Sequence, residues 1–473
     1  MTEAELDGLG AALEEFLQPY LFCCGYTQTF GHLHTYCRGL LSDLKRKSVE
    51  PMAQAAGCAV RTLQEFLRDH QWQHTQVRGQ LQQHVADALA DLPDDGLGNV
   101  GLIDETSALK SGAKTPGVQR QYLGCVGKID NGIVTVHLGV CKGRYKTLID
   151  AELFLPEDWA KDRERCRAAG IPDDLAYRPK STIALEELDR ARANPVPLDW
   201  ITFDEGYGKA PEFIGGLDGR HLRFVGEVPK SLSCLGINGS GHRPAAEVKG
   251  RRADDVVRQS PAFRRQPWVK VKLSRQTERT QVWEVKAARV WQRQDQEWST
   301  QTYGLIWARN VATGEEKYFL SNAPAAAELQ TLVRVAFRRW NVEHTFRVGK
   351  SELGFTHYEG RNYIGLMRHQ TLCLLMLTFV AGHTERLRGE KSGGDDGAGV
   401  QCVEPAEPGV AGEASRDESP RAQAGHHRLP PAPQPSRTRI PPGTSPAKKA
   451  AKGFTRSPLQ STTLKSPAVA LYC

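Results

Sequence analysis

The spacing of apolar residues changes near residue 98, and this change constrains the fold more than any other feature of the sequence. From about residue 5 to 92, apolar side chains recur every three or four positions, as in LGAALEEFLQPYL and VRGQLQQHVADALADL, which predicts helices. After Gly98 the chain continues in short apolar runs separated by turn residues, which predicts strands. We therefore expect a helical domain over residues 1–95, followed by a sheet.

Residues 51–68 are a helix-turn-helix candidate within the helical domain. A segment of small residues ends at Gly57, and an amphipathic segment from Val60 to Leu67 follows. Arg61 and Gln64 would face outward on the second helix, where they could contact DNA. An ordinary helical hairpin has the same pattern, so the spacing alone leaves DNA binding open.

The region from 96 to 232 predicts an α/β fold. The short apolar run VGLIDET comes first. QYLGCVGKIDNGIVTVHLGV then reads as two β-rich runs joined by the hairpin signal Asp130-Asn131-Gly132, and YKTLIDAELFLP as a third strand. A helical, charged segment and then the strand PLDWITF, the helix PEFIGGL and the strand HLRFVGEVP follow. Antiparallel strands followed by alternating strand and helix indicate a mixed sheet with helices on both faces.

Residues 233–325 read as a β-rich insertion, and helices return over residues 326–388. The most apolar run, LCLLMLTFVAG, is too short to span a bilayer and predicts a buried helix, so we expect no membrane partner. From 389 to 473 Gly, Pro, Ser, Ala, Arg and Glu dominate, which predicts a disordered tail.

Charge and cysteine content restrict the setting of the protein. A net charge of +7 over 473 residues is compatible with a polyanionic partner. Eleven cysteines are scattered without a CxxC pair, which indicates reduced thiols and no structural zinc. The acidic start MTEAELDGLG does not resemble a signal peptide, so a cytoplasmic location is expected.

Two acids follow apolar runs in the same way. Asp104 comes after GLI in LIDETS, and Asp204 comes after WITF in TFDEGYG. A carboxylate at the end of a buried strand is held rigidly, which suits a metal ligand or a general base. The ordinary alternative is that each acid begins a loop or caps a helix.

A third acid lies in the helical stretch RRWNVEHTFRVGKSELGFTHYEGR. Positions four and seven apart share one face of a helix, so Arg339, Glu343, Arg347 and Lys350 form one stripe. Such a stripe can be a solvated ladder of ion pairs worth about 0.2–0.5 kcal/mol per pair. It can also hold a metal at Glu343 while its cations bind phosphates.

Further cations follow Asp104 in a glycine-containing loop. Lys110, Lys114 and Arg120 could line a DNA track, or they could be solvated loop charge.

The segments LIDETSALKSGAKTPGVQRQYLGCVGKIDN, ITFDEGYG and RRWNVEHTFRVGKSELGFTHYEGR together resemble bacterial insertion-sequence transposases of the Asp-Asp-Glu (DDE) class. Within this class they are similar to the group with a Tyr-Arg-Glu-Lys signature, in the insertion-sequence-four clan and its seven-hundred-and-one-like branch. The resemblance covers about residues 35 to 385. It implies a ribonuclease-H-like catalytic core that is interrupted by a β-rich insertion before the last acid.

The resemblance also implies roles for individual residues. Asp104, Asp204 and Glu343 would be the catalytic acids and would hold two Mg²⁺ ions, with Mn²⁺ as a substitute. Arg339 and Lys350 match the signature Arg and Lys, which bind phosphates, whereas Ala336 stands at the signature Tyr position.

The implied partners are double-stranded DNA, as terminal inverted repeats and target DNA, and a second copy of the chain in a synaptic complex. The expected location is the bacterial cytoplasm, at the nucleoid. Two alternatives stay open at this point: a ribonuclease-H-like nuclease without strand transfer, and a transposase remnant that only binds DNA.

Overall fold

The computed structural model describes residues 8–237, 241–275, 278–294 and 296–391. The predicted disordered tail lies outside the described residues from 392 onward, while residues 389–391 form the end of the last helix.

The helical start of the chain is confirmed. Its elements are α2 (Leu9–Leu17), the 3₁₀ helix η1 (Gln18–Cys24), α3 (Thr27–Leu41), α4 (Val49–Ala55), α5 (Val60–Arg68) and α6 (His74–Asp91). The turn between α4 and α5 contains Gly57 at φ +66°, a conformation that a residue without Cβ adopts at little cost. On α5, Leu63 and Phe66 are buried whereas Arg61 and Gln64 are exposed, as predicted.

The first sheet is mixed, as predicted. Its strands are β1 (Val100–Leu109), β2 (Gln119–Leu123), β3 (Lys128–Lys142), β4 (Tyr145–Leu153) and β5 (Trp200–Phe203). β3 pairs antiparallel with β1, with β2 over its first residues and with β4 over its last. β5 pairs parallel with β1 on the side away from β3.

The predicted hairpin turn at Asp130-Asn131-Gly132 is wrong. These residues lie inside β3, opposite Gln119–Gln121, and the turn between β2 and β3 comprises residues 124–127. Gly127 takes φ +64° there. The Asn131 side chain instead ties the strand to the loop after β1, because its amide donates to the carbonyl oxygens of Lys110 and Gly112.

Helices cover both faces of this sheet. All nine residues of β4 are buried, which requires cover on each side. α9 (Lys180–Ala193) contacts β3 and β4, and α16 (Tyr363–Lys391) also contacts β4. Two short helices precede α9, namely α7 (Glu157–Lys161) and α8 (Arg163–Ala168).

The second sheet contains the β-rich segment. In spatial order it runs β6 (Val225–Glu227), β12 (Glu316–Ser321), β11 (Glu297–Asn310), β10 (Glu278–Gln294), β7 (Ser233–Gly236) and β8 (Arg251–Arg252), with β9 (Val269–Arg275) also paired to β10. The strand predicted in HLRFVGEVP is β6, which pairs with β12 of this sheet. A parallel bridge joins Ile201, the second residue of β5, to Phe224, the residue before β6. Four short helices accompany these strands: α10 (Glu205–Gly208), α11 (Pro211–Gly219), α12 (Ala253–Gln259) and α13 (Pro261–Arg264).

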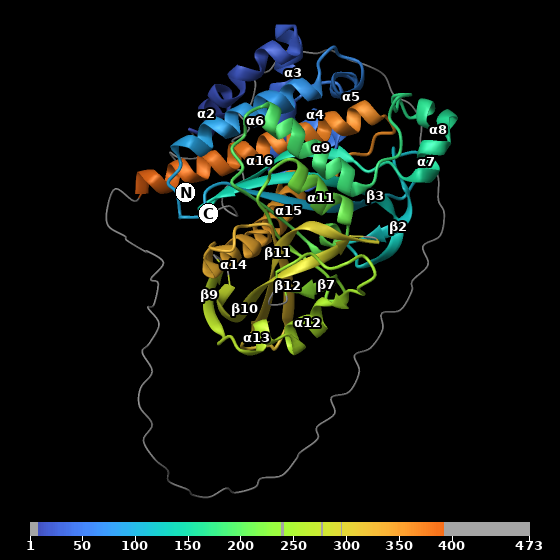
Figure 1. The fold of residues 1–473 in the computed structure, drawn as a ribbon. Helices are drawn as coiled ribbons and strands as arrows, with labels where there is room; N and C mark the ends of the chain where they lie inside the picture. The colour runs from blue at the N-terminus through green and yellow to red at the C-terminus, as the bar shows by residue number, and fades with distance from the viewer. Residues whose placement is uncertain (1–7, 238–240, 276–277, 295, 392–473) are drawn as a thin grey trace, which may run out of the picture. The chain divides into compact units, whose positions relative to one another are not determined.

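The last part of the fold consists of α14 (Leu329–Arg338), α15 (Trp340–Glu352) and α16. α16 contacts α3, α5 and α6, and Figure 1 shows it running beside these N-terminal helices. The sequence predicted an apolar segment too short to span a bilayer. This prediction is wrong, because α16 is long and apolar enough to do so. The prediction of a buried helix is confirmed, because 94% of its most apolar window is buried inside the protein.

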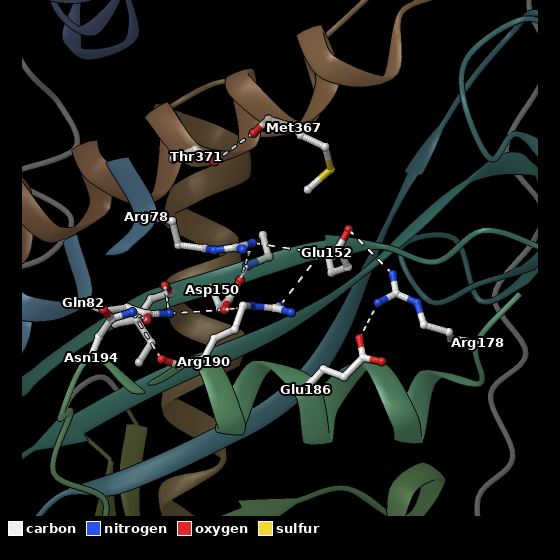
Figure 2. A network of polar contacts seen from close by, with 12 residues as sticks. Arg78, Gln82, Asp150, Glu152, Arg178, Glu186, Arg190, Asn194, Met367 and Thr371 are labelled. Carbon is white, nitrogen blue, oxygen red and sulfur yellow. Dashed lines mark hydrogen bonds and ion pairs between the residues drawn. The ribbon is translucent and has the colours of Figure 1, made fainter. Parts of the chain in front are cut away.

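A buried network of charges joins α6, β4 and α9 (Figure 2). Asp150 of β4 is fully buried and accepts from Arg78 of α6 at 3.0 Å and from Arg190 of α9 at 2.9 Å. Glu152, two residues further along β4, lies 3.8 Å from Arg190. Burial and the neighbouring Asp150 raise the pKa of Glu187 well above its usual value, although Arg190 acts in the other direction.

We predict that Asp150→Asn lowers the free energy of unfolding by about 3 kcal/mol, because the buried Arg78 and the partly buried Arg190 would lose their shared carboxylate. Asp173→Asn is the matched control, since Asp173 also pairs with two arginines but its side chain is 65% exposed. The control should change stability by less than about 1 kcal/mol. Urea unfolding at pH 7 measures both, and equal effects would contradict the assigned role of the network.

Candidate active site

Adjacent strands bring the first two predicted acids together. The parallel register pairs Ile103 of β1 with Phe203 of β5, so the residues that follow, Asp104 and Asp204, are neighbours. Asp204 directly follows β5, as predicted, and caps α10 by accepting from the backbone N–H of Tyr207 at 3.2 Å. The sequence therefore places one carboxylate at the end of a strand and the fold supplies its partner.

Asp104 does not end its strand, which corrects the prediction. β1 continues to Leu109 because its second half pairs with β3, up to the pair Leu109–Gly132. Asp104 therefore lies in the middle of β1, beside the end of the shorter β5. The pKa of Asp104 is raised to about 7, because burial and the neighbouring Asp204 raise it by more than Arg339 lowers it.

Arg339 connects Asp104 to the third predicted acid. It lies at the junction of α14 and α15, where one guanidinium nitrogen is 2.9 Å from Asp104 Oδ2 and another is 2.9 Å from Glu343 Oε1. One arginine thus bridges an acid of the sheet and an acid of the last helical region. The predicted pairing of Arg339 with Glu343 along the helix is confirmed, and the contact to Asp104 is added by the fold.

The surroundings of Arg339 are strongly acidic. Burial by itself would lower the pKa of Arg339, but nearby acids outweigh it and the pKa is raised. These acids are, in order of effect, Asp104, Glu343, Asp204 and Glu227. Glu227 was missed in the sequence, although it occupies a strand end in HLRFVGEVP just as Asp204 does in WITFDEG. Only the fold brings Glu227 near enough to Arg339 to affect its pKa.

The donor set partly fits a divalent metal ion. Asp104 and Asp204 supply adjacent, hard oxygen ligands of the kind Mg²⁺ prefers, and their mutual repulsion would be relieved by a cation. Glu343 is 55% exposed and is joined to this pair through Arg339. Within the described part of the chain, no group of three acid, His or Cys side chains is close enough to hold one ion. The pair therefore fits a metal, while Glu343 would reach it only after Arg339 moves.

The other residues predicted around Glu343 lie in different environments. Lys350 is half-buried. Burial lowers the pKa of Lys350, while the nearby Cys125 and Asp104 raise it by a smaller amount. Arg347 is exposed on α15. Ala336, which the resemblance places at the signature Tyr position, is 4% exposed, and its carbonyl accepts from the Thr202 hydroxyl at 3.3 Å.

The loop cations predicted for a DNA track are held differently from one another. Lys110 is half-buried and its Nζ donates to the carbonyl oxygens of Thr356, at 3.1 Å, and Tyr358, at 2.6 Å. Lys114 is exposed in the loop after β1. Arg120 is also exposed, but it lies on β2 rather than in the loop.

Sequence reasoning missed Arg46 and Lys47, which enter from the segment between α3 and α4. Arg46 forms an ion pair with Glu359. Lys47 is buried, and its Nζ donates to the carbonyl oxygens of Leu40, at 2.8 Å, and Glu352 at the end of α15. A basic pair inside a helical domain is too common to attract notice, so no signal in the sequence marked these residues.

A comparison with known families now identifies the chain. The sequence model described as DDE superfamily endonuclease matches residues 21–294, which is more than half of the protein. The chain belongs to the DDE superfamily of endonucleases. This match includes Asp104 and Asp204, whereas Glu343 lies beyond its end.

One relative of this DDE endonuclease is the probable transposase for insertion sequence element IS701 of Microchaete diplosiphon, 31% identical over 201 residues. The aligned part is 42% of this chain, and it spans about half the length of that relative, 48%. These two matches confirm the resemblance to the IS701-like branch of DDE transposases that was inferred from the sequence.

Among solved structures, a piggyBac transposase in a synaptic complex with hairpin DNA is similar at a TM-score of 0.37 and 11% identity, covering 77% of this chain and 68% of that one. A TM-score this low carries no argument about fold or activity.

Because DDE endonucleases generally act with divalent ions, we predict that Mg²⁺ binds the Asp104–Asp204 pair more tightly as pH rises. The raised pKa of Asp104, about 7, means that its proton competes with the metal below neutrality. Affinity should therefore increase about tenfold between pH 6 and pH 8.

Isothermal titration calorimetry measures this dependence on pH. Asp204→Asn should weaken binding at every pH, while Asp158→Asn, an exposed acid on α7, should leave it unchanged. An affinity that is flat over this range would contradict the assignment of Asp104 as a ligand.

Proposed function

We propose that this protein is an insertion-sequence transposase that cuts the phosphodiester bond at the ends of its element and joins the freed 3′-hydroxyl to target DNA. The observation that carries the proposal is the meeting of Asp104, Asp204 and Arg339-linked Glu343 at one place, from three segments far apart in the sequence. Membership of the DDE endonuclease superfamily and the similarity to an IS701 transposase support it.

The three acids would hold two divalent ions, Mg²⁺ in preference and Mn²⁺ as a substitute. Bound there, the ions would clamp the attacking and leaving oxygens of the phosphodiester. The parallel pairing of β1 with β5 fixes two of the ligands on a rigid sheet. The order of antiparallel strands followed by a parallel one also supports the proposed ribonuclease-H-like core, with residues 96–232 and 326–388 as its two parts and residues 233–325 as the insertion.

Arg339 and Lys350 would serve the phosphate. Arg339 donates to one oxygen of each of two carboxylates, and a phosphate likewise offers negatively charged oxygens that a guanidinium binds in pairs. An exchange of Glu343 for phosphate would free this acid to join Asp104 and Asp204. Arg347, Lys114 and Arg120 are exposed and would extend the contact with the DNA backbone.

The N-terminal helices, assigned to residues 1–95, would recognise the terminal inverted repeats, with Arg61 and Gln64 on the outward face of α5. Arg61 is bound to Glu65 at 2.6 Å and would exchange that partner for phosphate or base. Cutting two ends in concert requires two active sites, so the working form would be a homodimer on paired ends, at the bacterial nucleoid.

The test is cleavage and strand transfer on a labelled duplex that carries the terminal repeat flanking the element, in the presence of Mg²⁺. We predict that wild-type protein cuts and joins. Glu343→Gln and Asp204→Asn should bind the duplex and lower the cleavage rate by at least about a thousandfold, because each removes a ligand of the reacting centre.

Glu205→Gln is the matched control, because Glu205 is an exposed acid next to Asp204 and should be dispensable. Cleavage without joining would favour a nuclease that lacks strand transfer. Binding without any cleavage by the wild type would contradict the proposal and favour a remnant that occupies DNA.

A further inference from the structure

A basic pocket of about 530 Å³ lies outside the site described above. Three segments far apart in the sequence form it: the linker between α3 and α4, the loop after β1 and the loop between α15 and α16. Its charged lining residues are Arg46, Lys110, Lys114, Arg361 and Glu359. Four cations against one acid give the pocket a strong preference for an anion.

The walls of the pocket are held in place by buried amines. Lys110 fixes the loop between α15 and α16 through the carbonyl oxygens of Thr356 and Tyr358. Lys47 fixes the linker that carries Arg46, because its backbone N–H also donates to His357 Nδ1 at 3.0 Å. The cations at the rim, Arg46, Lys114 and Arg361, are exposed and face solvent from these fixed segments.

The positive field inside the pocket acts on the groups that line it. Burial and then Arg46 lower the pKa of Lys110 to about 8. Burial lowers the pKa of His357 as well, with Arg46, Lys47 and Lys110 acting in the same direction. A bound anion would relieve the repulsion among these cations, because Glu359 is the one acid among the pocket's described lining residues.

The pocket lies along the strand that carries the first acid. Lys110 is the residue directly after β1 and lies six positions beyond Asp104. At a rise of about 3.3 Å per residue, the two are about 20 Å apart along the strand. Lys350 lies between them: it is near Asp104 and near Cys125, whose N–H donates to Ser107 of β1. Cations therefore follow β1 from Arg339 through Lys350 to the pocket.

From this arrangement we infer that the pocket binds the sugar–phosphate backbone of double-stranded DNA about six nucleotides from the bond that is cut. The distance follows from a rise of about 3.4 Å per nucleotide along one strand of the duplex. The inference rests on the proposed function for the position of the cut. It adds a defined pocket, in which Arg46, Lys110 and Arg361 accompany Lys114, and a stated distance along the DNA.

Cations and the hydroxyl groups of Ser111, Thr115 and Thr356 line the pocket. The one aromatic among its described lining residues, Tyr358, is only 7% exposed, so the lining favours phosphate over a stacked base as the bound group.

The experiment measures the affinity of the full chain for the terminal-repeat duplex at several salt concentrations. The variant is Lys114→Gln with Arg361→Gln, which removes two exposed cations of the rim. The control is Lys161→Gln with Arg167→Gln, which removes two exposed cations of α7 and α8 that are paired with Glu157 and Asp173. Both variants lose the same charge, so a general electrostatic effect would change them equally.

We expect the slope of log affinity against log salt to fall by about two in the rim variant and to stay unchanged in the control. A single neutral methylphosphonate, moved along the duplex one position at a time, should weaken wild-type binding most at about six nucleotides from the cut. The rim variant should not respond at that position.

The outcomes separate the two proposals. If the wild type cuts the duplex but both double variants keep its salt slope, the pocket is not a backbone site and the proposed function stands. If the slope falls in the rim variant alone but no strand is ever cut, the pocket is confirmed and the proposed function is contradicted. Loss of binding to a labelled nucleoside triphosphate in the rim variant, with DNA binding unchanged, would overturn the DNA assignment in favour of a nucleotide site.

Discussion

The guanidinium of Arg339 between Asp104 and Glu343 is the interaction on which the candidate active site depends. Asp104 and Asp204 are held side by side by paired strands, and Asp104 is almost fully buried. Two carboxylates in such a place repel each other unless a cation is near. Arg339 supplies that cation from another part of the chain, so the sheet and the last helical region come together around one charge.

Buried cations also attach the N-terminal helices to the rest of the protein. Arg368 of α16 donates to the carbonyl oxygen of Leu67 in the last turn of α5, at 3.0 Å, and to that of His70 just after it, at 2.8 Å. Lys47 does the same at the end of α15. Carbonyl groups at a helix C-terminus lack partners within the helix, and these side chains satisfy them. The region proposed to recognise DNA is thereby fixed directly to the helix that carries Glu343.

The sequence predicted the elements better than their boundaries and partners. The helical start, the mixed sheet and the β-rich segment follow from the spacing of apolar residues, because that spacing differs between a helix and a strand with one buried face. The hairpin at Asp130-Asn131-Gly132 failed because a local turn signal competes with the pairing of long strands, and here pairing prevailed. Likewise the length of β1, which places Asp104 in its middle, is decided by its neighbour β3.

What the sequence determined by itself is the set of chemical groups: the acids after the apolar runs, the charged stripe on α15 and the outward-facing Arg61 and Gln64 of α5. These depend on residue type and on spacing along a single element. Tertiary structure alone decided which groups meet. Asp104 joins Asp204 through the register of β1 and β5, Glu227 comes near Arg339 through β6, and Arg46 reaches the loop cations through the anchor at Lys47. The physical reason is that contacts between distant segments are selected by the packing of the whole fold, which no local pattern encodes.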